Sequence, residues 1–74
     1  MNNLESIKKL EKVLQDKGYI ILETFGDEEA YEIKYFRLGN YTELWIQSNR
    51  VTMVEGFAHI SDIEMANKIL GGEE

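Results

Sequence analysis

The side chains best suited to chemistry in this sequence are acidic, since it has 14 Asp and Glu, one histidine and no cysteine. One histidine without cysteine is too little for a zinc site. Ser61 lies near His59, but it is better placed as a helix cap, and no oxyanion motif surrounds it. The sequence also lacks a phosphate-binding glycine loop and a calcium loop. We therefore expect no enzyme, metal, cofactor or small-molecule substrate.

The acidic residues are concentrated after residue 18. Residues 19–74 carry four basic and 11 acidic side chains, so this part of the chain is more negative than the whole chain, whose net charge is −6. Such a chain repels phosphates, so we expect neither nucleic acid nor a membrane as partner, but a basic protein. The simpler alternative is that the acidity only keeps a small protein soluble. Setting aside the acids that start helices, the candidate partner-binding carboxylates are Glu23, Asp27, Glu28, Glu29, Glu32, Glu43 and Glu55.

A β-hairpin between residues 30 and 48 is expected to position several of these carboxylates. Apolar side chains alternate over 31–36 and 43–47, and Gly39-Asn40 between them suits a type II′ turn. That turn would pair Tyr35 with Leu44 and Ile33 with Ile46 on one apolar face, which we expect to be core. On the other face it would pair Phe36 with Glu43 and Lys34 with Trp45, and this face would also carry Tyr41.

Two helices flank the expected strands. Leu4, Ile7, Leu10 and Leu14 recur at helical spacing, with Asn2 or Asn3 as the cap and Gly18 as the stop. The second helix is expected to begin at Ser61, with Glu64 completing a capping box, and to end before Gly71. Its expected core side comprises Ile63, Ala66, Ile69 and Leu70.

Two further strands complete the pattern. Residues 19–25 form a strand that is apolar on both faces at its start, and residues 51–57 form the last one. Before the last strand, a two-residue loop would pair Ile46 with Met53, whereas a three-residue loop would pair Leu44 with Val54. We prefer the second because it points Glu55 outward, and we expect a bulge at Gly56.

The element order predicts one α+β domain over residues 1–74. It consists of a helix, a four-stranded antiparallel meander and a helix, with both helices on one sheet face. No apolar run is long enough to span a bilayer and no signal peptide is evident, so we expect a cytoplasmic protein.

The sheet face opposite the helices carries Phe36, Tyr41 and Trp45, which predicts an apolar contact. Together with the apolar first strand, these aromatic residues favour a homodimer. The alternative is that they are single exposed apolar residues of the ordinary kind.

In size, charge and element order, the whole chain resembles the small acidic host-takeover proteins of phages. Among these it is similar to the DNA-mimic proteins, including the inhibitor of the nucleoid-associated protein HU. The resemblance implies a homodimer in the host cytoplasm whose carboxylates imitate duplex phosphates and block the DNA-binding surface of an HU-like protein.

The competing interpretation is an interaction or regulatory module that binds a partner through the aromatic sheet face, with the acidity incidental. Salt dependence separates the two interpretations, because only charge mimicry weakens steeply as salt rises.

Overall fold

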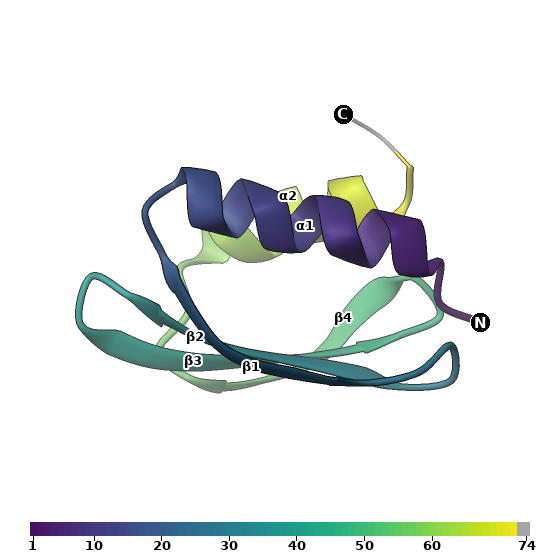
Figure 1. Ribbon diagram of the computed structural model, residues 1–74, viewed down its shortest axis with the longest axis horizontal. Coiled ribbons are helices and arrows are strands. Elements are labelled where there is room, and N and C mark those ends of the chain that lie inside the picture. The colour runs from purple at the N-terminus through teal and green to yellow at the C-terminus, as the bar shows by residue number, and fades with distance from the viewer. Residues whose placement is uncertain (73–74) are drawn as a thin grey trace.

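The computed structural model describes residues 1–72 and has the α+β architecture expected from the sequence (Figure 1). The sheet is antiparallel, in the order β1-β2-β3-β4, and both helices cover the same face of it. Within the described residues, no helix is long and apolar enough to cross a membrane. The elements are α1 (Leu4–Asp16), β1 (Ile20–Gly26), β2 (Tyr31–Arg37), β3 (Asn40–Gln47), β4 (Arg50–Gly56) and α2 (Ile60–Leu70).

The core lies between the helices and the sheet. Its largest fully buried side chain is Tyr35, which stacks on Tyr19 with the ring centroids 5.7 Å apart. Of the expected core side of α2, Ala66 and Leu70 are buried, whereas Ile63 and Ile69 are half-buried. The other buried apolar residues follow the predicted periodicity: Ile7, Leu10 and Leu14 of α1, and Ile33, Leu44 and Ile46 of the hairpin.

The central hairpin turns one residue earlier than predicted. Leu38 and Gly39 form the turn, both with positive φ (51° and 84°), as a type I′ turn requires. The register therefore differs by two residues from the expected one, and Ile33, not Tyr35, lies opposite Leu44. An even shift leaves every side chain on its predicted face. It replaces the expected Phe36–Glu43 pair by Phe36–Tyr41, whose rings meet edge-on.

A β-bulge explains why β1 begins with consecutive apolar residues. Ile21 pairs with Tyr35 and Glu23 pairs with Lys34, so Leu22 is the extra residue. Ile20 and Leu22 are exposed, whereas Ile21 is packed against the core.

The last strand has the predicted Leu44–Val54 pair, but the loop before it is not the preferred three-residue loop. Ser48 and Asn49 form a two-residue turn with positive φ, and a register shift near Thr52 then restores the alternation. The prediction of a bulge at Gly56 is therefore wrong, because the register shift lies near Thr52. Gly56 has φ +80°, and a Cβ there would lie 2.2 Å from the carbonyl oxygen of Tyr41.

Both helix caps can now be assigned. Asn3 caps α1 by accepting hydrogen bonds from the backbone N–H groups of Glu5 and Ser6. Asn2 is instead buried, and its side-chain amide donates to the Ile46 carbonyl at 3.1 Å. The predicted Ser61 cap of α2 is wrong, because α2 begins at Ile60 and His59 is the cap.

Candidate functional site

The sheet face opposite the helices, called the open face below, has no element packed on it in the described residues (Figure 1). Because strand register aligns side chains across a sheet, the open face is organised in three rows, each named after its member on β3. The Tyr41 row contains Ile20, Phe36 and Tyr41, the Glu43 row contains Glu23, Lys34, Glu43 and Glu55, and the Trp45 row contains Phe25, Glu32, Trp45 and Met53.

The two outer rows are largely apolar and reach solvent. Their six large apolar side chains are between 37% (Trp45) and 62% (Ile20) exposed. Phe57 follows the end of β4, its backbone N–H donates to the Tyr41 carbonyl, and its side chain is also exposed. A concentration of aromatic side chains on one uncovered face is typical of a protein-binding surface.

The Glu43 row between them is acidic and internally connected. Lys34 Nζ lies 3.7 Å from Glu23 Oε2 and 3.8 Å from Glu43 Oε1. The Tyr41 hydroxyl donates a hydrogen bond to Glu43 Oε1 and, with help from Lys34, holds the pKa of that carboxyl below its ordinary value. The same hydrogen bond, reinforced by partial burial, raises the pKa of Tyr41 to about 12. Three carboxylates against one lysine leave the row with a net charge of −2.

The seven predicted carboxylates fall into two groups. Glu23, Glu32, Glu43 and Glu55 lie on the open face, but Glu32 and Glu43 are buried at 5% and 9% exposure. Asp27, Glu28 and Glu29 lie in the loop between β1 and β2. Asp27 Oδ1 accepts hydrogen bonds from the backbone N–H groups of Glu29 and Ala30, which lower the pKa of Asp27 and shape the turn. The carboxylates therefore do not form one continuous exposed array.

The three predicted aromatic contacts share the open face. Phe36 and Tyr41 pair in one row, and Trp45 lies in another, on the far side of the Glu43 row. Sequence reasoning missed Phe25 and Met53, which share this face. The alternation of β1 and β4 could have indicated Phe25 and Met53, but bulges in both strands obscure it.

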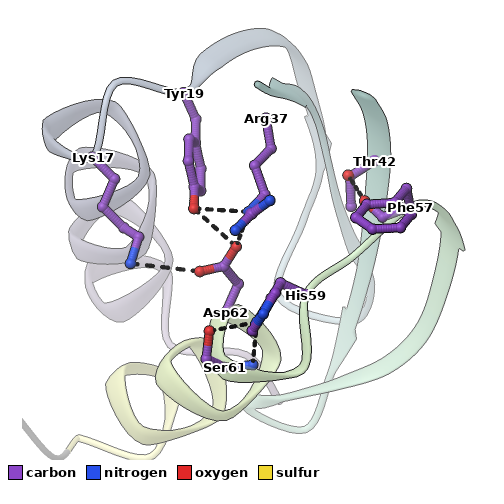
Figure 2. A network of polar contacts seen from close by, with 8 residues as sticks. All are labelled: Lys17, Tyr19, Arg37, Thr42, Phe57, His59, Ser61 and Asp62. Carbon is purple, nitrogen blue, oxygen red and sulfur yellow. Dashed lines mark hydrogen bonds and ion pairs between the residues drawn. The ribbon is translucent and has the colours of Figure 1, made fainter. Parts of the chain in front are cut away.

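A buried ion cluster on the helix side was also missed (Figure 2). Asp62 lies in the first turn of α2, and its side chain is only 3% exposed. Its Oδ2 accepts from Arg37 Nε at 2.8 Å and from the Tyr19 hydroxyl at 3.0 Å, while Lys17 Nζ lies 3.5 Å from Oδ1. The cluster joins α2 to β2 and to the end of α1, so its role is to position the elements that support the sheet.

The pair of Ser61 and His59 has the geometry of a cap rather than of a catalytic dyad. His59 Nδ1 accepts from the backbone N–H of Ser61 and lies 2.7 Å from Ser61 Oγ (Figure 2). In residues 1–72 no carboxylate is hydrogen-bonded to the imidazole, as a third member would be, and Asp62 is held by Arg37 instead. The same residues contain no cluster of three or more metal-ligating side chains.

Comparisons with protein families, with curated proteins and with solved structures gave no match for this chain.

Proposed function

We propose that this chain is a protein-interaction module that binds another protein through the open face of its sheet. The observation that supports the proposal is the set of exposed apolar side chains on that face, with aromatic residues in both outer rows. Aromatic side chains are enriched where interfaces derive most of their binding energy. We further propose that the protein acts in the cytoplasm and that it is not an enzyme.

A second copy of the chain is a competing occupant of the open face. A homodimer would cover the apolar rows, as the sequence led us to expect. It would also oppose two Glu43 rows, each with a net charge of −2 and with its only lysine already paired. Burying like charges against each other is unfavourable, so we favour a different protein as the partner. Sedimentation of a single dimeric species, converted to monomer by Trp45→Ser, would contradict that choice.

Charge mimicry is the second candidate function. The observation in its favour is that Glu23, Glu43 and Glu55 lie in one row crossing the sheet, in a chain with a net charge of −6. Neighbouring strands are about 4.8 Å apart, so the sheet holds these three carboxylates at fixed spacing, with Lys34 between Glu23 and Glu43. In this alternative the row and the acidic loop occupy the DNA-binding surface of a basic, HU-like protein.

An affinity experiment tests the main proposal. The bait is the chain itself, compared with the double variant Phe36→Ser/Trp45→Ser, which removes one aromatic side chain from each outer row. The control is Leu38→Ser/Ile60→Ser, because these side chains are 80% and 68% exposed but lie outside the three rows. We expect a partner that is retained at high salt by the original chain and the control, and lost by the open-face variant. Equal capture by all three baits would contradict the proposal.

Competition for DNA tests the second candidate. Labelled duplex DNA bound to HU is titrated with the chain at low and at high salt. Release of the DNA at low salt only, weakened by Glu23→Gln/Glu55→Gln, supports charge mimicry, because screening removes charge-based binding. Absence of release at both salt concentrations would reject HU as the target.

A further inference from the structure

The most unusual group on the open face is the Glu32 carboxylate. Glu32 is only 5% exposed, yet within residues 1–72 it has no hydrogen-bond donor or cation paired with its side chain. By contrast, Glu43 in the next row has both Tyr41 and Lys34. The carboxylate oxygens keep some access to solvent, because the Tyr35 hydroxyl is the one fully buried side-chain polar atom without a partner in residues 1–72. A carboxylate that is so largely covered and has no donor still needs an explanation.

Glu32 lines a hollow of about 400 Å³ at the Trp45 end of the open face. Its lining residues on the open face include the aromatic Phe25 and Trp45, and the acidic residues that line it are Asp27, Glu29 and Glu32. Lys34 is not among the lining residues; its ammonium lies 5.2 Å from the Phe25 ring centroid and is paired with Glu23 and Glu43. The hollow therefore combines aromatic walls with carboxylates that form no ion pair with any cation in residues 1–72.

We infer that this hollow binds an arginine side chain of the protein partner, with Glu32 as its counter-ion. A guanidinium can stack on an aromatic ring and at the same time donate paired hydrogen bonds to a carboxylate. The inference rests on the proposed function and adds the chemistry of the partner, which presents arginine beside apolar residues. This role explains why Glu32 has no partner in the free chain, because the arginine of the complex supplies its counter-ion.

A direct titration tests the site without knowledge of the partner. The probe is N-acetyl-arginine amide, the reporters are the backbone amide resonances and the indole of Trp45, and the control ligand is N-acetyl-citrulline amide, which has the same shape without the charge. We expect saturable shifts at Phe25, Glu32 and Trp45 with a dissociation constant on the order of 10 mM, and at least about tenfold weaker binding of the citrulline compound. Equal binding of both compounds, or no saturation by arginine, would overturn the inference.

Glu32→Gln provides a second test with two readouts. It should weaken arginine binding at least about tenfold, whereas Glu55→Gln on the same face should change it less than about twofold. Without ligand, Glu32→Gln should raise the melting temperature by about 5 °C, because it removes a charge that is largely covered and has no partner. A fall in melting temperature would show that Glu32 is needed for folding, which contradicts the inference.

The outcomes separate this inference from the proposed function. If the open-face variant loses the captured protein but arginine does not bind, the open face is an interface and only the arginine site is wrong. If arginine binds but protein capture does not depend on Phe36 and Trp45, the proposed function is wrong.

Discussion

Replacing Asp62 by asparagine should remove a large share of the stability of this domain. The Asp62 carboxylate accepts two hydrogen bonds, from Arg37 and Tyr19, and lies 3.5 Å from Lys17. Asparagine keeps the shape but removes the charge, which leaves Arg37 without a counter-ion at only 17% side-chain exposure. Breaking a buried pair costs about 3–5 kcal/mol, and we take about 3 kcal/mol because Arg37 and Lys17 retain some contact with water.

The stability lost in Asp62→Asn is a large part of the free energy of unfolding of the whole domain. A domain of 74 residues has a free energy of unfolding of roughly 4–11 kcal/mol, at about 0.05–0.15 kcal/mol per residue. A loss of about 3 kcal/mol should then lower the melting temperature by about 12–24 °C. Urea unfolding followed by Trp45 fluorescence and by circular dichroism measures the change.

Asp16→Asn is the matched control for Asp62→Asn. It breaks the ion pair between Asp16 and Lys12, in which the lysine side chain is 76% exposed and the aspartate side chain 66% exposed. The free energy of unfolding should therefore change by less than about 0.5 kcal/mol. The double variant Asp62→Asn/Arg37→Gln should lose less than the sum of its single variants, because both residues act in one cluster. Equal stability of Asp62→Asn and Asp16→Asn would refute this account of the cluster.

Two further predictions concern the sheet. Gly56→Ala should destabilise the domain by more than about 1 kcal/mol, because the new Cβ would meet the Tyr41 carbonyl. The control Gly18→Ala has open space around it and should cost only about 1 kcal/mol. Equal losses of stability in thermal unfolding would count against the close approach at Gly56. Tyr41→Phe should raise the pKa of Glu43 toward its ordinary value of 4.5, as measured by NMR titration. Because the folded-state pKa of Glu43 is depressed, its stabilising contribution is present above the unfolded pKa and is lost as pH falls through the folded one, so the variant should show less of this acid dependence. An unchanged Glu43 pKa would show that the Tyr41 hydroxyl is not its main partner.

The hydrophobic pattern determined which side chains face the core. Alternation in the hairpin assigned Ile33, Tyr35, Leu44 and Ile46 to one face, and the structure buries all four. The same pattern could not determine the register, because a shift by two residues leaves every residue on the same face. In the structure Leu38 takes the left-handed conformation, and the register that this turn sets pairs Phe36 with Tyr41.

The sequence patterns that mark a helix start also failed to predict the contacts of the polar residues there. The position of Asp62 near the start of α2 was predictable, but its pairing with Arg37, 25 residues earlier, depends on how α2 docks on the sheet. Ser61 and Glu64 satisfied the pattern of a capping box, yet the helix begins at Ile60, where the His59 imidazole accepts from the backbone.

By itself, the sequence determined the element order, the acidic character and the placement of Phe36, Tyr41 and Trp45 on the face away from the core, since these follow from composition and from a period of two. Only the tertiary structure distinguished among the acids. Glu32 and Glu55 are both outward-facing glutamates in strands, but Glu32 lies buried on a central strand between Phe25 and Trp45, and Glu55 lies exposed on an edge strand. The cost of a carboxylate depends on what surrounds it in three dimensions, and neighbours in the sheet come from distant parts of the chain.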